Sequence, residues 1–342
     1  MREIKPNKKN IFSKFFIKIC RFFGFEIIDQ SNFAAPVSNK SLNESLSVPG
    51  KRSITLPLGE VKITRKVKSF DVILRTCMTV NMLTQSKKRI FEKEKEEYTK
   101  RTLVSIIKSI NHAKIKFKET KFKIYVIDHN SQNDQMNMLK NILNNSQIDF
   151  EIKNLDFNRY SKEIKKINEE NKEVTSNQKS NMSNIHQSII LSKEKCEDLT
   201  YFVEDDYLHK LNAVSEILFA YEKFSSLINN ELIICPTDYP YLYTGANDTK
   251  VFMGENRHWR KIDQTLCSFV MSKKIINNYY EELISMCKFE HYPFEKPLHN
   301  IYKKELCISP IPSLSVHFTN INSIYGLSPN VDWKKLWEEN ES

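Results

Sequence analysis

The chain has 342 residues, enough to bury one large core or two smaller ones, and its 40% apolar and 27% charged residues are ordinary for a soluble globular protein. A formal net charge of +10 favours an anionic partner, such as a nucleotide, a nucleic acid or an anionic membrane surface, without choosing among them. No apolar run reaches the roughly 18 residues that a membrane span needs.

The cysteines and glycines exclude several other classes. Seven cysteines are scattered without a C-x-x-C pair, which favours reduced thiols in the cytosol over a disulfide framework or a zinc site. Only six glycines are present, and neither a G-x-G-x-x-G nor a P-loop pattern occurs. We therefore expect a cytoplasmic protein that binds any phosphate ligand without these glycine-rich loops.

Residues 1–30 have the pattern of a basic amphipathic helix. Between Ile11 and Phe23, aromatic residues and Ile alternate with Lys and Arg at helical spacings. Such a helix lies in a membrane interface or packs on the main domain, and the sequence supports both equally. A signal peptide is disfavoured because lysines interrupt the apolar stretch and no small-residue cleavage site follows. Residues 31–66, rich in Ser, Asn, Pro and Lys, are predicted to be a linker.

After residue 66 the pattern alternates between strands and helices. Strands are expected at 70–77, 122–128 and 148–152, and helices at 88–113 and 133–144. This order predicts an α/β fold, with a parallel sheet covered by helices on both faces. Ligands of such sheets gather at the carboxyl ends of the strands, where Arg75, Thr76 and Asp128 are expected.

An acidic strand end is the central motif of the sequence. The apolar run Leu199–Val203 leads directly into Glu204, Asp205 and Asp206. Three adjacent carboxylates repel each other, and a divalent cation offsets that cost because hard cations such as Mg²⁺ and Mn²⁺ bind carboxylate oxygens. We interpret the motif as a metal site that holds a substrate phosphate. A solvated acidic loop is the alternative.

Three short motifs, in this order, resemble those of nucleotide-sugar glycosyltransferases of the GT-A fold, above all the large inverting family 2. They are the strand-then-acid segment 126–134, the helix start Ser183–His186 and the DXD-like segment Phe202–Asp206. The resemblance covers about residues 68–330. It implies a Rossmann-like GT-A catalytic domain at 67–333, with a mixed, mainly parallel sheet, followed by a tail at 334–342.

The resemblance also implies roles for individual residues. Asp128 contacts the donor base, and its neighbour Asn130 is assigned to the donor with it. Glu204 faces the ribose, Asp205 is assigned to the donor, and Asp206 holds the metal. Glu204 departs from the family pattern, which has Asp at this place.

The catalytic base is expected near the start of a late helix. The family has a Glu-Asp pair there, and this chain has the single acid Glu295 in the segment 294–302. Glu295 is therefore the first choice, with Asp238 and Asp263 as reserves. An inverting transferase needs such a group to take the proton from the acceptor hydroxyl. The alternative for Glu295 is an N-terminal charge favoured by the helix dipole.

Two further motifs suit the same chemistry. Arg257, Trp259 and Arg260 offer guanidinium groups to a diphosphate and an aromatic plane to a sugar. A Trp that anchors a loop, with Arg on the surface, is the alternative. His317 resembles the late His that several GT-A enzymes use as an additional metal ligand, and imidazole suits Mn²⁺. A purely structural His is the alternative there.

We expect an Mn²⁺- or Mg²⁺-dependent glycosyltransferase of hexosyltransferase type. It moves a sugar from a nucleotide-sugar donor to a hydroxyl of a glycan or lipid-linked glycan, as in cell-surface polysaccharide synthesis, with the leaving diphosphate stabilised by metal and Arg. The N-terminal helix is expected at the inner face of the plasma membrane, and no nucleic-acid partner is expected. One alternative is a non-catalytic nucleotide- or membrane-binding protein with this fold. Another is a metal-dependent nuclease, for which we would expect a second cluster of acids or His and extended basic and aromatic stripes, and the sequence shows neither clearly.

Overall fold

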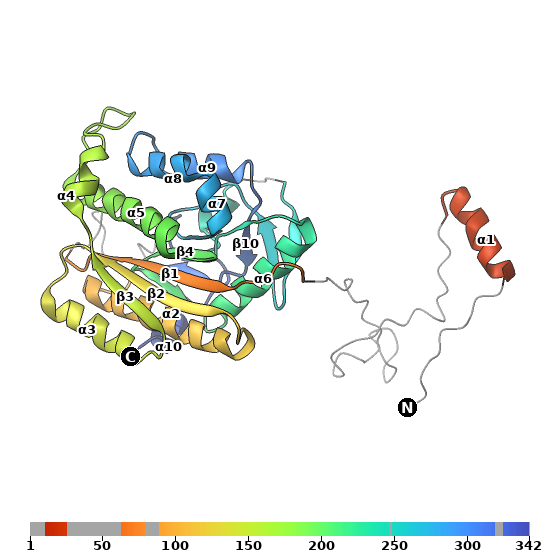
Figure 1. Ribbon diagram of the computed structural model, residues 1–342, viewed down its shortest axis with the longest axis horizontal. Helices are drawn as coiled ribbons and strands as arrows, with labels where there is room; N and C mark the ends of the chain where they lie inside the picture. The colour runs from red at the N-terminus through yellow and green to blue at the C-terminus, as the bar shows by residue number, and fades with distance from the viewer. Residues whose placement is uncertain (1–10, 26–62, 80–88, 246–247, 319–323, 342) are drawn as a thin grey trace. The chain divides into compact units, whose positions relative to one another are not determined.

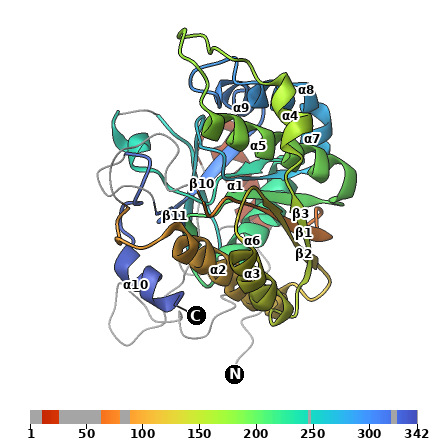
Figure 2. The same ribbon diagram turned by 90° about the vertical axis from the view of Figure 1, so that its left-hand side faces the viewer.

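The computed structural model describes residues 11–25, 63–79, 89–245, 248–318 and 324–341 (Figures 1 and 2). The chain divides into two units, Met1–Lys62 and Ile63–Ser342. The described part of the first unit is helix α1 (Ile11–Phe22) and the turn after it, so the helix expected within residues 1–30 is present. None of the residues of α1 is buried. Of the linker predicted at 31–66, residues 31–62 lie outside the described residues.

The second unit is built on a nine-stranded sheet with the order β3-β2-β1-β4-β9-β6-β10-β8-β7. Its first four strands are parallel: β1 (Ser69–Thr76), β2 (Lys121–Asp128), β3 (Asp149–Asn154) and β4 (Leu199–Glu204). The remaining strands are β6 (Ile233–Ile234), β7 (Val251–Met253), β8 (His258–Lys261), β9 (Phe269–Ser272) and β10 (Cys307–Ile311). Among these, β9 is antiparallel to both of its neighbours, and β6 and β10 are parallel. The predicted fold class, a mixed α/β sheet with a parallel half, is confirmed.

Helices cover both faces of this sheet, as both views show (Figures 1 and 2). One face carries α5 (Ser176–Lys195), α7 (Lys273–Asn278), α8 (Tyr280–Cys287) and α9 (Lys296–Tyr302). The other carries α2 (Lys95–Lys116), α3 (Asn133–Asn144), α6 (Ala213–Ile228) and α10 (Trp333–Glu339). The shorter elements are α4 (Phe157–Tyr160), η2 (Ser161–Glu163), η3 (Pro240–Tyr243) and a small sheet in which β5 (Tyr207–His209) pairs with β11 (Ser315–His317). Among the described residues, no helix combines the length and apolar character of a bilayer span.

Local sequence explains why the strand ends and the start of α5 are well defined. All eight residues of β1 and five of the six in β4 are buried, which fits their apolar runs, because central parallel strands are covered on both faces. α5 begins with a capping box, in which Thr175 accepts from the backbone of Gln178 and Gln178 bonds back to Thr175. This box fixes the first turn of α5.

Two predicted boundaries are wrong. The helix expected from residue 88 begins only at Lys95. The segment predicted as a tail, 334–342, contains most of α10, because Leu336 and Trp337 bury in a second small core with Tyr98, Leu208, Val316 and Phe318. Arg101 of α2 also donates to the backbone carbonyl of Trp337 at 2.5 Å. The segment therefore belongs to the second unit.

Candidate active site

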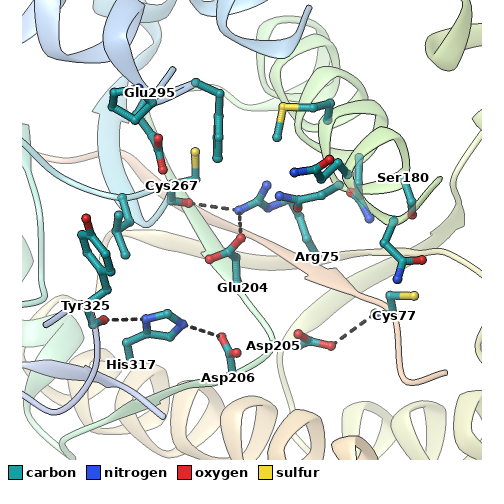
Figure 3. A pocket seen from close by; sticks show the side chains of 18 of the residues that line it. Arg75, Cys77, Ser180, Glu204, Asp205, Asp206, Cys267, Glu295, His317 and Tyr325 are labelled. Carbon is teal, nitrogen blue, oxygen red and sulfur yellow. Dashed lines mark hydrogen bonds and ion pairs between the residues drawn. The ribbon is translucent and has the colours of Figure 1, made fainter. Parts of the chain in front are cut away.

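The carboxyl ends of β1 and β4 open into a cavity of about 530 Å³ (Figure 3). The two strands pair in parallel with Arg75 opposite Glu204, so both side chains arrive at the same edge. The start of α5, the loop before β9, the segment before α9 and β11 complete the wall. The wall contains four carboxylates and three permanent cations, namely Glu204, Asp205, Asp206, Glu295, Arg75, Arg89 and Lys95.

Glu204, Asp206 and His317 form a candidate metal site. Each offers one ligand atom, and these atoms lie within 4.8 Å of one another. His317 Nε2 is 3.4 Å from Asp206 Oδ1, and Nδ1 is 2.7 Å from the backbone carbonyl oxygen of Tyr325 (Figure 3). The carbonyl can only accept, which places the N–H on Nδ1 and leaves Nε2 as a ligand. Two carboxylates and an imidazole are suitable ligands for Mn²⁺ or Mg²⁺, so the residues fit such an ion.

The charges around this site shift three pKa values. Burial raises the pKa of the Glu204 carboxyl, and the neighbouring Arg75 only partly opposes it. Burial also works to raise the pKa of Asp206, but His317 and Lys95 outweigh it and hold that pKa well below its usual range. The pKa of His317 is raised, because Asp206 outweighs the effect of burial. The site thus favours an ionised Asp206, which is the form that binds a cation.

Asp205 has a different environment from its two neighbours. Its Oδ2 accepts from the backbone N–H of Cys77 at 3.2 Å and from the Thr99 hydroxyl at 3.0 Å, and its Oδ1 lies 2.5 Å from Lys95 Nζ. Both oxygens are therefore held by protein donors. Asp205 lines the cavity, but its carboxylate is directed toward α2 and Lys95, and its role in donor binding stays a prediction.

Arg75 stands between the acids and the loop before β9. Its Nη2 lies 3.0 Å from Glu204 Oε1 and donates to the carbonyl oxygen of Cys267 at 3.2 Å. Its Nε and Nη1 are buried, and no hydrogen-bond partner for them is found among the described residues. Burying donors without a partner costs free energy, and a hydrogen-bond acceptor that enters the cavity would remove that cost.

Glu295 lies on another wall of the same cavity. Figure 3 shows its carboxyl group pointing toward the side of Cys267 and Glu204. It is the N-cap residue of α9 but makes no capping hydrogen bond with its side chain. Burial raises the pKa of Glu295 to about 7, with a further contribution from Glu204. A carboxyl group with this pKa is matched to proton transfer near neutral pH.

Several predicted site residues lie near the strand ends, where their side chains form hydrogen bonds within the adjacent turn or lie outside the cavity wall. Asp128 is buried and accepts from the hydroxyls of Thr76 and Ser131, both at 2.6 Å. These bonds close the turn after β2, in which Asn130 is exposed and has a φ of 61°. Thr76 is part of the cavity wall, whereas Asp128 and Asn130 are not among the described residues that line it.

The predicted cluster around Asp238 lies elsewhere, outside the lining of the cavity. Asp238 accepts from Arg260 Nη2 at 2.6 Å and from the Tyr243 hydroxyl, and only 1% of it is exposed. Trp259 is fully buried in the core. Arg257 donates to the carbonyl oxygen of Pro312 at 2.6 Å. The reserve base, Asp263, is exposed and does not line the cavity either.

Other residues of the wall were not predicted from the sequence. Arg89 and Lys95 bring cations within 4 Å of Asp206, at 3.8 and 3.9 Å. The first turns of α5 bring a row of amide and hydroxyl side chains: Asn177, Gln178, Ser180, Asn181 and Asn184. Ser and Asn are common at helix starts in general, so the local sequence does not mark this row as part of a site.

No protein-family model matches the sequence, and the comparison with curated proteins found no match. Among solved structures, a UDP-glucose pyrophosphorylase complexed with UDP-glucose matches at 10% identity, over 80% of this chain and 97% of that chain, with a TM-score of 0.38. The inositol-1-phosphate CTP transferase from T. maritima matches at 13% identity, over 81% and 97%, with a TM-score of 0.40. Mouse xyloside xylosyltransferase 1 matches at 10% identity, over 69% and 76%, with a TM-score of 0.38. Likenesses this weak do not decide the function, which has to come from the site itself.

Proposed function

We propose that this chain is a metal-dependent, nucleotide-sugar-dependent glycosyltransferase of the GT-A type. The observation that carries the proposal is the composition of one cavity wall at the carboxyl ends of β1 and β4. Glu204, Asp206 and His317 suit a divalent cation there, and Arg75 and Lys95 suit a diphosphate. A cavity of about 530 Å³ is in the range that takes a ligand of this size.

Mn²⁺ or Mg²⁺ is the cation we propose for these three residues, where it supplies Lewis-acid stabilisation of the leaving diphosphate. The chain's own cations add to that stabilisation, because Arg75 and Lys95 face the same space. Glu295 takes the proton from the acceptor hydroxyl, for which its pKa of about 7 is suited. We propose that the transfer inverts the anomeric centre, with the acceptor hydroxyl attacking the anomeric carbon directly while Glu295 takes its proton.

Donor hydrolysis is the most direct test, because it needs no knowledge of the acceptor. The purified chain is incubated with Mn²⁺ and with UDP-, GDP- and ADP-linked sugars in turn, and the released nucleotide and sugar are measured. We expect one nucleotide class to be cleaved between the sugar and the diphosphate, slowly without acceptor. Cleavage within the diphosphate instead, to a nucleoside monophosphate, contradicts glycosyl transfer, as does the absence of turnover with added glycan acceptors.

For the first unit we propose peripheral binding to an anionic membrane, where lipid-linked acceptors lie at the cytoplasmic face. Large apolar side chains of α1 are exposed, including Phe12 at 84% and Phe22 at 86%. Lys14, Lys18 and Arg21 recur at helical spacing, and no acidic residue lies within the helix. Apolar area on one side and positive charge on the other suit the interface of an anionic bilayer.

Vesicle sedimentation tests this part. We expect the full chain to pellet with phosphatidylglycerol-containing vesicles and not with pure phosphatidylcholine. Replacing Phe12 and Phe16 with Ser should abolish pelleting, and replacing Lys14 and Lys18 with Gln should weaken it in a salt-dependent way. Equal pelleting of all variants contradicts a role for α1.

A further inference from the structure

Lys95, the first residue of α2, is a nearly buried cation at the edge of the candidate metal site. Its Nζ lies 2.5 Å from Asp205 Oδ1 and 3.9 Å from Asp206 Oδ2, and 11% of its side chain is exposed. An ammonium group has three N–H donors. Of these two carboxylates, only Asp205 is within hydrogen-bond distance. Lys95 therefore keeps donors for a ligand in the cavity that it lines.

Asp205 is the group that holds this lysine in place. The donors on its Oδ2 come from Cys77, just after β1, and from Thr99 in α2, so residues from three elements meet at one carboxylate. They orient the carboxylate so that Oδ1 faces Lys95. Asp205 is absent from the set of close potential ligands, which is Glu204, Asp206 and His317. Its geometry is that of a residue that acts through Lys95.

Arg75 is a second cation, on the Glu204 side of the same strand end (Figure 3). Its side chain is 5% exposed and lies 3.0 Å from Glu204. The two buried nitrogens without a partner among the described residues, Nε and Nη1, belong to different edges of the planar guanidinium, and Nη2 is part of both edges. Each edge therefore has one unsatisfied donor that the oxygens of a phosphate group can accept.

The two cations thus contact different carboxylates of the metal site, Arg75 beside Glu204 and Lys95 beside Asp206. Building on the proposed function, we propose that Arg75 and Lys95 bind the donor's diphosphate directly and that Asp205 is the positioning residue for Lys95. The diphosphate then binds the metal-free chain. A divalent cation strengthens that binding, because it neutralises Glu204 and Asp206, which otherwise attract the two cations. By linkage, the diphosphate strengthens binding of the cation by the same factor.

Inorganic pyrophosphate is the probe, because it contains the phosphates without base or sugar. Its affinity is measured by calorimetry with EDTA and with Mn²⁺, and the affinity for Mn²⁺ alone is measured by electron paramagnetic resonance. We expect the wild-type chain to bind pyrophosphate in EDTA and to bind it more tightly with Mn²⁺. UDP and GDP are titrated in parallel.

Two variants separate the proposed roles. Lys95→Met should weaken pyrophosphate binding in EDTA by about tenfold or more, the usual cost of losing a charge-assisted hydrogen bond. Asp205→Asn should weaken it by a similar factor and leave Mn²⁺ binding intact, unlike Asp206→Asn, which should lose Mn²⁺. Lys116→Met is the matched control, since this lysine of α2 pairs with Glu255 at 3.0 Å outside the cavity.

The double variant Lys95→Met/Asp205→Asn distinguishes positioning of Lys95 from a general structural role of Asp205, because the two roles predict different pyrophosphate affinities. If Asp205 acts only through Lys95, the double variant binds pyrophosphate no more weakly than Lys95→Met alone. It also removes both charges, so that no unpaired buried carboxylate is left to prevent folding. Thermal unfolding checks that each variant is folded.

Unchanged pyrophosphate affinity in Lys95→Met overturns this inference, and so does loss of Mn²⁺ binding in Asp205→Asn, which makes Asp205 a ligand. These results are distinct from failure of the proposed function. A chain that binds UDP or GDP only with Mn²⁺ and is indifferent to Lys95 keeps the proposed function and loses this inference. A chain that binds no diphosphate under any condition loses both.

Discussion

Two clusters of acids and arginines in this protein look alike in the sequence and differ in the structure. Around Asp238, both carboxylate oxygens accept short hydrogen bonds, from Arg260 and Tyr243, and the cluster lies outside the cavity. Around Asp206, the His317 ring lies at 3.4 Å and the cations Arg89 and Lys95 lie at 3.8 and 3.9 Å, and the carboxylate lines the cavity. Both clusters contain the same residue types, so residue type does not identify the functional carboxylate. It is identified by oxygens that the protein's own donors do not saturate and by its exposure to a cavity that a ligand can enter.

The largest expected effect tests the cavity side of this comparison. Glu295→Gln should lower turnover by about 10²–10⁴-fold, the usual contribution of a positioned general base, with donor binding retained. Because only the deprotonated carboxylate accepts a proton, wild-type kcat/KM should rise with pH through about 7, the pKa of Glu295. The pH profile of the residual Glu295→Gln activity should lack this rise. A variant that keeps both full turnover and the pH dependence contradicts the assignment.

Asp206→Asn should have the next largest effect. It keeps the shape of the side chain and removes the charge that a divalent cation needs, so turnover should fall roughly a hundredfold or more. Mn²⁺ titration followed by electron paramagnetic resonance checks the cause. Full activity or full Mn²⁺ affinity in this variant removes Asp206 from the metal site.

Asp238→Asn is the matched substitution in the closed cluster. It leaves Arg260 without its charged partner, and breaking a buried ion pair costs about 3–5 kcal/mol of stability. We expect a lower midpoint of denaturant unfolding and an unchanged affinity for Mn²⁺. If Asp238→Asn loses activity at full stability, Asp238 takes part in the reaction and the two clusters do not differ in function.

The smallest expected effect concerns a buried polar group away from both clusters. His209 is enclosed by Ser105 and the Tyr201 hydroxyl, and burial lowers its pKa to about 3. The unfolded chain takes up this proton near pH 6.5 and the folded chain does not. Stability is therefore complete above pH 6.5 and falls by up to about 1.4 kcal/mol per pH unit as the pH drops toward 3. Denaturant unfolding at pH 7 and pH 5 should show a smaller loss for His209→Gln than for the wild type.

The strands and the acidic strand end were predictable from sequence. Strands β1 and β4 lie in the interior of the sheet. Central strands have apolar sequences that end where polar residues begin, as at Leu199–Glu204. The parallel arrangement of β1 and β4 follows from the alternation with helices. Convergence of Arg75 and Glu204 at one edge follows from the same rule and is confirmed by their pairing in register.

The rest depended on contacts between distant residues. Lys95 and Asp205 form an ion pair although they are 110 positions apart in the sequence, and the residues around each of them do not predict this contact. The sequence predicts a function for Asp238 and Arg260 because strand ends and arginines are typical of binding sites. The sequence does not show that they satisfy each other within the fold. The prediction of a tail at 334–342 is wrong because α10 is short and its two buried residues find their partners only in the folded protein.

The most direct test of the central claim is thermal unfolding with a panel of nucleoside diphosphates, with Mn²⁺ and with EDTA, in the wild type and in Asp206→Asn. A ligand that binds only the folded chain adds roughly 2.7 kcal/mol at a hundredfold excess over Kd, which is readily visible. We expect one base class to stabilise the wild type, more strongly with Mn²⁺, and this Mn²⁺-dependent gain to disappear in Asp206→Asn. Absence of stabilisation by every diphosphate, with and without metal, contradicts the claim that this cavity binds a nucleotide-sugar.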